Sequence, residues 1–357
     1  MKDERHISNP SNQIINVGLV GFGMSGQIFH APFIQAHQGF RLKTIVTSGE
    51  NAKAAYPKSI QLKDFSEALE DSEIDLMVIC TPHSLHFEQA KQAMHSGKGV
   101  VIEKPVALNS DDIKALMTVA AETDKKVFPY HNRRWDGDFL TVKHLIKEGF
   151  LGDVVEFESH FDRYSPTVSR AEWRYNNPDG GGTLFDLGPH LIDQAISLFG
   201  KPEAIWCKLY HHRPGSKVND SFDLKLHYAE MTATLKAGIF VREPGPRFQV
   251  HGTLGSYMKY GLDTQESRLK KGRKPDSENL GKDLKQNFGI LHSMSQNKQT
   301  KVVYPTFNGD YMGFYNNVYN VLTNSIKAEV KLEDALLGIQ IIEAAFRSNS
   351  EERTIYL

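Results

Sequence analysis

The sequence predicts a two-domain α/β protein, with a Rossmann-type doubly wound parallel sheet in the first half and a large, mainly antiparallel sheet in the second. The chain has 357 residues, more than one ordinary hydrophobic core accommodates. Short apolar runs alternate with helical stretches up to about residue 130, and strand-like runs dominate afterwards. We therefore expect one domain over residues 14–130 and a second α/β domain over residues 131–357.

The first half contains six apolar runs that are typical of buried parallel strands. They are residues 14–20, 41–46, 59–62, 74–80, 99–103 and 127–130. Periodic stretches between them predict helices, including residues 25–38, 87–96 and 111–123. Pro32 lies inside the first of these stretches, so we expect a kink there, because proline removes a backbone hydrogen bond.

The second half is rich in alternating, strand-like runs, which favours a largely antiparallel sheet. The runs are residues 154–162, 203–212, 222–228, 231–237 and 248–251. Residues 311–327 and 332–348 predict two closing helices. The charged, glycine-containing segment 263–285 predicts an excursion on the surface.

Composition excludes several classes of protein. Lys plus Arg total 42 and Asp plus Glu total 43, so a net charge of -1 gives no case for binding nucleic acid or an anionic membrane surface. The chain has no apolar run near the roughly 18 residues of a membrane helix, and residues 1–13 form a polar tail without the apolar core of a secretion signal. The two cysteines give neither a disulfide framework nor zinc-ligand spacing. A cytoplasmic protein is expected.

A glycine-rich loop follows the first predicted strand. Gly21-Phe22-Gly23-Met24-Ser25-Gly26 matches G-x-G-x-x-G after an apolar strand and before a helix. In such a loop the first glycine makes the tight turn, the second lets a pyrophosphate approach the backbone, and the third lets helix and strand pack closely. The helix N-terminus would attract the phosphates. The alternative is an ordinary glycine-rich turn; the strand–loop–helix context favours a dinucleotide.

The end of the second predicted strand addresses the choice between NAD and NADP. An NAD enzyme usually places an acid there, about 20 residues past the glycines, to bind the ribose 2′-hydroxyl. Here Thr47 and Ser48 occupy the strand tip, followed by Gly49. Hydroxyl groups can bind a 2′-phosphate and do not repel it, although Glu50 lies nearby. We therefore expect NADP, with NAD as the alternative.

Two further patterns carry candidate chemistry. The fifth predicted strand ends in Lys104, at the carboxyl edge where doubly wound sheets bind ligands. Asp186 and His190 are four residues apart, so on a helix they share one face, and a carboxylate beside an imidazole can fix its tautomer. The alternatives are a surface lysine in a turn and a hydrogen-bonded helix start. No third ligand supports a metal site.

These motifs together resemble the Gfo/Idh/MocA family of oxidoreductases over nearly the whole chain. The resemblance rests on the glycine loop, on Cys80-Thr81-Pro82, on Glu103-Lys104-Pro105 and on the Asp186…His190 helix. Within the family, residues 130–136, 161–164 and 272–275 look most similar to NADP-dependent scyllo-inositol dehydrogenases. Such relatives often carry an arginine where this chain has Gly49, which leaves Lys53 as a candidate substitute.

The resemblance implies a set of site residues. The implied catalytic residues are Lys104, Asp186 and His190. The implied cofactor-binding residues are Gly21, Phe22, Gly23, Met24, Ser25, Gly26, Thr47, Ser48, Cys80, Thr81, Pro82, His86, Glu103, Lys104 and Pro105. The implied substrate-binding residues are Lys104, His131, Arg134, Arg163, Tyr164, Trp173, Asp186 and His190. Taken singly, His86 is more typical of a hydrogen-bonded histidine than of a ligand-binding one.

The implied activity is reversible hydride transfer between NADP and a secondary alcohol of a cyclic polyol or sugar, for example scyllo-inositol. His190 would act as the general base, Asp186 would orient it or bind a hydroxyl, and Lys104 would stabilise the developing alkoxide. Two alternatives stay open: another sugar or diol substrate, or a non-catalytic regulator of the same fold. The family also implies an open-faced second sheet with helices on one side, and hence a homodimer or homotetramer.

Overall fold

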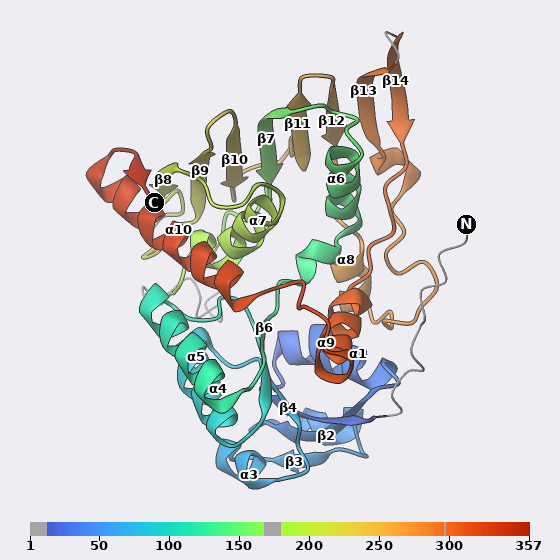
Figure 1. The fold of residues 1–357 in the computed structure, drawn as a ribbon, viewed down its shortest axis with the longest axis vertical. Helices are drawn as coiled ribbons and strands as arrows, with labels where there is room; N and C mark the ends of the chain where they lie inside the picture. The colour runs from blue at the N-terminus through green and yellow to red at the C-terminus, as the bar shows by residue number, and fades with distance from the viewer. Residues whose placement is uncertain (1–12, 168–179, 296–297) are drawn as a thin grey trace.

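The structure is a computed structural model that describes residues 13–167, 180–295 and 298–357. Figure 1 shows two sheets, one built by the first third of the chain and one by the rest, with helices between them. Both sheets and their helices confirm the predicted α/β class. Among the described residues, no helix is both long and apolar enough to cross a membrane.

The first sheet has six parallel strands, and all six runs expected from the sequence form them. They lie in the order β3-β2-β1-β4-β5-β6. The chain therefore adds strands toward one edge up to β3 and then toward the other edge from β4, with the switch point between β1 and β4. The strands are β1 (Ile15–Val20), β2 (Phe40–Val46), β3 (Ile60–Leu62), β4 (Leu76–Ile79), β5 (Gly99–Ile102) and β6 (Val127–Pro129).

Helices cover both faces of this sheet (Figure 1). They are α1 (Ala31–Ala36), α2 (Asn51–Ala55), α3 (Phe65–Glu70), α4 (His86–His95) and α5 (Ser110–Thr123), with the short turns η1 (Gly26–His30), η2 (His83–Leu85) and η3 (Asn132–Trp135). The segment after β1 begins as the π-helical turn η1 and becomes α-helical at Ala31. Pro32 therefore lies in the first turn of α1, where its missing N–H has no intrahelical partner to lose. The irregularity expected at Pro32 takes the form of this change of helix type.

The second sheet has nine strands in the order β14-β13-β12-β11-β7-β10-β9-β8-β15. Its pairs are antiparallel except β7 with β10, which are parallel. Five strands were expected from the sequence, and β12 to β15 were not. The nine are β7 (Val154–His160), β8 (Ala204–Tyr210), β9 (Ser221–His227), β10 (Thr232–Ala237), β11 (Phe248–Gly252), β12 (Gly255–Lys259), β13 (Gly289–Ser295), β14 (Lys298–Tyr304) and β15 (Ile355–Tyr356).

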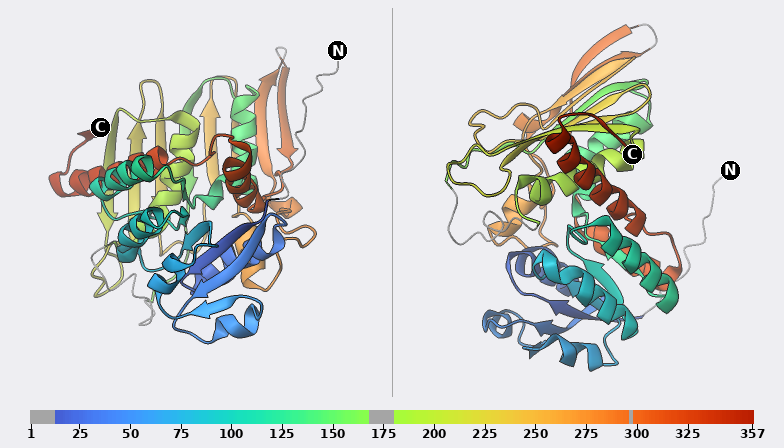
Figure 2. Two further views of the ribbon diagram at one scale, coloured as in Figure 1. Left: turned by 60° about the horizontal axis from the view of Figure 1, so that its bottom comes forward. Right: turned by 90° about the vertical axis from the view of Figure 1, so that its left-hand side faces the viewer.

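Helices α6 (Gly137–Lys147), α7 (Thr183–Phe199) and α10 (Leu332–Glu351) lie on one face of the second sheet, as Figure 2 shows. Strand residues on that face, such as Phe157 and Leu224, are fully buried. The other face is polar as well as apolar: Lys236 on β10 pairs with Asp223 on β9 at 3.5 Å. The open face therefore carries charged side chains, because the pleat places alternate residues of each strand on that side.

Segment 263–285 is not a simple surface excursion, which corrects the expectation from its charge. It contains helix α8 (Gln265–Lys270) and buries Leu269 and Leu280 against the first domain. The Asp263 carboxylate accepts the backbone N–H of Gly137 at 2.8 Å. The exposed run 270–274 holds four basic residues and one glycine. The charge pattern in the sequence therefore reflected only the solvent-facing side of the segment.

The two domains share packing through the last helices. Helix α9 (Met312–Asn324) packs beside α1 on the first sheet, and α10 packs against α5 (Figure 1). One continuous hydrophobic cluster includes Leu116 of α5, Ile192 of α7 and Ile342 of α10. The relative position of the two sheets is therefore fixed by a common core, since apolar burial is the main stabilising term in folding.

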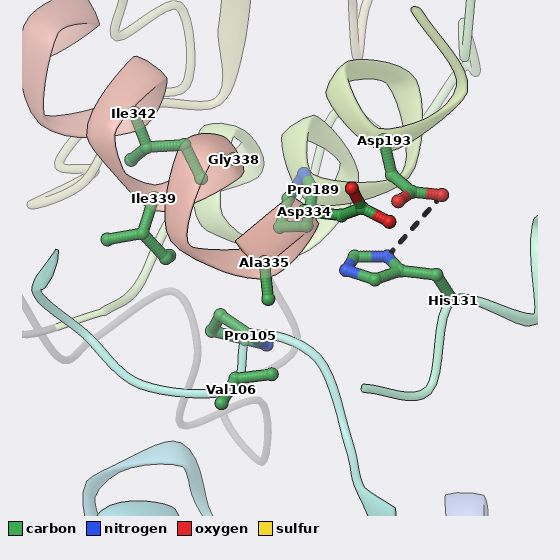
Figure 3. A pocket seen from close by; sticks show the side chains of 10 residues that line it. All are labelled: Pro105, Val106, His131, Pro189, Asp193, Asp334, Ala335, Gly338, Ile339 and Ile342. Carbon is green, nitrogen blue, oxygen red and sulfur yellow. Dashed lines mark ion pairs between the residues drawn. The ribbon is translucent and has the colours of Figure 1, made fainter. Parts of the chain in front are cut away.

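A small hollow of about 10 Å³ remains where α7 and α10 meet the loop after β5 (Figure 3). A space of this size holds at most one water molecule. Its lining is mostly apolar and consists of Pro105, Val106, His131, Pro189, Asp193, Asp334, Ala335, Gly338, Ile339 and Ile342.

Gly338 lines this hollow from the interior of α10, and a Cβ atom built there would meet only Ile192, at 4.0 Å. We expect Gly338→Ala to raise the free energy of unfolding by about 1 kcal/mol, because alanine is the better helix former. Urea denaturation at neutral pH measures the change. Ala335→Gly, on the same helix and the same hollow, should lower stability by a similar amount. A destabilised Gly338→Ala variant would contradict this account of the packing.

Candidate active site

The glycine loop joins β1 to η1 and has the shape that a dinucleotide requires. Gly21 has φ +93°, and a Cβ there would lie 2.8 Å from the Cys80 carbonyl oxygen. A Cβ at Gly26 would collide with the carbonyl oxygen of Gly21, so helix and strand approach more closely than a side chain permits. Nothing lies within 4 Å of the Cβ position of Gly23. That open position is the one through which a pyrophosphate reaches the backbone.

The tip of β2 carries the hydroxyl groups expected from the sequence. The Thr47 hydroxyl accepts the backbone N–H of Gly49 at 3.2 Å, and Gln61 donates to the Gly49 carbonyl at 2.5 Å. These bonds fix a turn in which Ser48 is exposed. Lys53 follows on α2 and is also exposed. The turn therefore offers donors and no carboxylate at its apex.

The loops after β4 and β5 are joined by His86. Its Nδ1 lies 2.8 Å from the Pro105 carbonyl oxygen and its Nε2 lies 2.9 Å from the Thr81 carbonyl oxygen. Burial lowers the pKa of His86, although both carbonyl groups oppose that shift. The Thr81 hydroxyl donates to Gln89 at 2.6 Å. His86 thus supports the two loops from beneath, at the carboxyl edge where a nucleotide would lie.

Glu103 lies under the glycine loop. Its carboxylate accepts hydrogen bonds from the Ser25 hydroxyl, from His30 Nε2 at 3.1 Å and from the backbone N–H of Lys104 at 3.0 Å. Burial acts to raise the pKa of this carboxyl, but His30, Ser25 and Lys104 outweigh it and hold the pKa at about 2. Glu103 is therefore ionised and connects the glycine loop to the Lys104 corner.

Lys104 and Asp186 meet across the two domains. The Lys104 ammonium donates to the Asp186 backbone carbonyl at 2.6 Å and to its carboxylate at 3.2 Å. Asp186 lies in the first turn of α7, which Asn219 anchors by accepting the Leu184 N–H at 2.8 Å. The sequence predicted that Asp186 shares a helix face with His190, whereas its ion pair with Lys104 was not predicted.

His190 follows one turn later on the same helix and is 7% exposed. Burial lowers the pKa of His190 well below its ordinary value, and the positive charges of Lys104 and Arg133 lower it further. The imidazole is therefore neutral at neutral pH. Its Nδ1 is buried without a hydrogen-bond partner in the described part of the chain. A neutral imidazole beside an ammonium and a carboxylate can accept a proton from an alcohol.

Comparison with known proteins agrees with this geometry. Residues 15–131 match the model of the oxidoreductase family NAD-binding Rossmann fold, and residues 143–357 match the model of its C-terminal alpha/beta domain. The chain belongs to the Gfo/Idh/MocA family of oxidoreductases.

Two relatives with named activities match nearly the whole chain and about half of it, respectively. The scyllo-inositol 2-dehydrogenase (NADP(+)) IolW of Bacillus subtilis is 37% identical over 345 residues, 96% of each chain. The inositol 2-dehydrogenase of Rhizobium meliloti is 30% identical over 193 residues, which is 52% of this chain and 56% of that one. Among solved structures, yvaA of Bacillus subtilis superposes with a TM-score of 0.94 at 36% identity, covering 97% of this chain and 99% of the other.

Arg134 and His131, which the family resemblance assigns to substrate, lie beside Asp193. The Arg134 guanidinium donates to both Asp193 oxygens, at 2.9 and 2.7 Å, and to Asp334 at 2.9 Å. His131 lines the hollow of Figure 3, with its Nδ1 4.0 Å from Asp193, and burial lowers its pKa. The Arg134 side chain therefore ties the chain after β6 to α7 and α10, and its contact with substrate stays a prediction.

Tyr164 lies on an exposed loop. Its hydroxyl accepts a hydrogen bond from Arg242 at 2.8 Å, and the Arg242 guanidinium lies 3.9 Å from the centre of its ring. The backbone N–H of Arg163 donates to the Gly238 carbonyl at 2.8 Å. Trp173 lies outside the described residues. The substrate roles expected for these three residues in this Gfo/Idh/MocA protein stay predictions.

Two arginines near His190 were missed from the sequence. The guanidinium carbons of Arg133 and Arg247 lie 4.9 and 4.0 Å from the centre of the Phe161 ring. Arg247 is buried and donates to Gln194 at 2.8 Å, while Arg133 pairs with Asp136 at 3.3 Å. Arg133 is in the run 130–136 that carried the family resemblance, so its position could have been flagged. Arg247 immediately precedes strand β11, where the sequence has no local signal for a charged core residue.

Proposed function

We propose that this family member catalyses reversible hydride transfer between NADP and a ring carbinol of a cyclic polyol or sugar, with an inositol as the leading substrate. The observation that supports it is the cluster of Lys104, Asp186 and His190 at the carboxyl edge of β5, next to the glycine loop. The inositol assignment rests on the names of the relatives from Bacillus subtilis and Rhizobium meliloti.

The residues divide the chemistry between them. When bound, the nicotinamide exchanges a hydride with the carbinol carbon. His190, neutral at neutral pH, takes the hydroxyl proton during oxidation and returns it during reduction. Lys104 supplies a positive charge for the developing alkoxide, and Asp186 holds its ammonium at 3.2 Å. One proton leaves the site for each alcohol oxidised.

The catalytic roles have a direct test. We expect Lys104→Ala and His190→Ala to lower kcat by about 10²–10⁴, since each removes a group that handles charge or a proton in the transition state. Fluorescence titration should show cofactor affinity close to that of the native protein. His211→Ala, which removes an exposed histidine, serves as the control and should leave kcat unchanged. The substrate for these assays is found first, by screening a panel of polyols and sugars with NADP and with NAD.

The same test has a pH component. Because burial lowers the pKa of His190, its neutral, proton-accepting form persists as the pH falls through 6.5, and alcohol oxidation should not decline there. Turnover that halves at pH 6.5 in step with an ordinary histidine would contradict the assignment. So would a His190→Ala variant with native kcat.

Cofactor preference is a second expectation. Thr47 and Ser48 at the β2 tip should give a higher kcat/KM with NADP than with NAD, because no carboxylate repels the 2′-phosphate there. Gly49→Arg should strengthen the NADP preference by roughly 2- to 5-fold, the size of an exposed ion pair. Gly49→Gln, which adds length without charge, is the matched control. A native enzyme that prefers NAD would refute the proposal.

We also infer a homodimer or homotetramer formed through the helix-free face of the second sheet. That face carries exposed Tyr210, Met294 and Val303 among its charged residues. Light scattering at micromolar concentration should show more than one chain per particle. Glu158→Arg, at a central strand of this face, should weaken the assembly through like-charge contacts, whereas a monomeric native protein would overturn the inference.

A further inference from the structure

One buried histidine near the active site has no part in the mechanism above. His30 ends η1, is fully buried, and its ring centre lies 4.1 Å from that of Tyr130. Its Nδ1 lies 2.7 Å from the Tyr315 hydroxyl and its Nε2 lies 3.1 Å from a Glu103 oxygen. A histidine held at both ring nitrogens has a fixed orientation and a fixed pattern of protons.

The ionised Glu103 determines the direction of one of these two hydrogen bonds. Burial raises the pKa of Tyr315 well above its ordinary value, so its hydroxyl keeps its proton and can donate to Nδ1. The ionised Glu103 only accepts. Nε2 therefore carries the proton that points at Glu103. Tyr315 is on α9, so a helix near the end of the chain contacts a residue near its beginning.

Glu103 passes this constraint to two functional segments. Its other hydrogen bonds come from the Ser25 hydroxyl, in the glycine loop, and from the backbone N–H of Lys104. His30 and Ser25 contact the same carboxylate oxygen, Oε1, whereas the Lys104 N–H donates to the other oxygen, Oε2. Loss of His30 leaves Oε1 with the Ser25 hydroxyl alone among these donors, so the carboxylate that accepts the Lys104 N–H is held less firmly.

We propose that His30 is a positioning residue: with Tyr315 it holds the Glu103 carboxylate in the orientation that places Lys104 beside Asp186 and couples that corner to the glycine loop. This proposal rests on the proposed function, because it assigns His30 to the hydride-transfer site. It predicts an effect on turnover that exceeds any effect on cofactor binding.

Paired substitutions separate this role from simple packing. His30→Leu removes the donor to Glu103, whereas the amide of His30→Gln can place an N–H near the position of Nε2. We expect kcat to fall by roughly 10- to 100-fold in His30→Leu and to recover most of that loss in His30→Gln. The dissociation constant of NADP, measured by fluorescence titration, should change by less than about 3-fold.

A matched pair on α9 tests the second contact. Tyr315→Phe removes the hydroxyl that contacts His30. Tyr319→Phe removes a hydroxyl one helical turn later, which donates to the Gln13 carbonyl at 3.0 Å. Only Tyr315→Phe should lower kcat and shift the pH profile of kcat. The proposal is overturned if folded His30→Leu retains native kcat, if His30→Gln is no better than His30→Leu, or if the two tyrosine variants behave alike.

A measurement without turnover keeps this proposal distinct from the proposed function. The groups that face Glu103 are His30, Lys104, Cys80, Tyr130 and Tyr315. Its pKa, about 2 in the fold against 4.5 as its ordinary value, gives stability that is full above pH 4.5 and is lost as the pH falls toward 2.

His30→Leu raises that pKa, so its stability deficit in urea should be largest above pH 4.5 and shrink below it. If no polyol or sugar is turned over, the proposed function fails while this deficit still links His30 to Glu103. A deficit that does not change with pH would overturn the link itself.

Discussion

The contact between Lys104 and Asp186 is the interaction on which the site depends, because it joins the loop after strand β5 of the first sheet to helix α7, which covers the second sheet. Both side chains are largely buried, and taking two charges out of water costs free energy unless each finds close partners. The ammonium finds two oxygens of Asp186, and Asn219 fixes the start of α7 that presents them. The shared core of α5, α7 and α10 then holds the two elements at this separation.

The charges around His190 constrain what it can do. Lys104, Arg133 and Arg247 all disfavour its protonation, so the imidazole is ready to accept a proton but is a weak base. A weak base removes a proton from an alcohol only when the alkoxide is stabilised as it forms. In the proposed mechanism Lys104 stabilises that alkoxide, so Lys104 and His190 act together. Arg133 lies 3.3 Å from Asp136 and Arg247 lies 3.6 Å from Asp138, so a carboxyl group holds each guanidinium that disfavours protonation of His190.

The sequence predicted what short-range patterns encode. The six strands of the first sheet, the glycine loop and the Asp186–His190 helix face follow from apolar periodicity and from chemistry within a few residues. Strand β14 was missed because most of its residues are exposed and so carry no alternating apolar pattern. His30 was missed because its partners, Glu103 and Tyr315, are 73 and 285 residues away and only the fold brings them together. The sequence could not show that Arg133, and not Arg134, contacts Phe161. Arg134 instead pairs with Asp193, a contact that no local pattern predicts.

In the proposed function the two domains divide the work, with the cofactor bound by the first and the substrate by the second. The contacts of the glycine loop, His30 and Glu103 lie within the first sheet and its covering helices, whereas His190, Phe161 and Arg247 lie on the second. The two sets meet at Lys104. The Glu103 carboxylate accepts its backbone N–H, and the Asp186 carboxylate accepts its ammonium. Side chains on the second sheet can therefore change the substrate without moving the phosphate loop, provided that this corner stays fixed. The buried ionised state of Glu103 is the physical means of fixing it, because a carboxylate held by three donors resists reorientation far more than a solvated one.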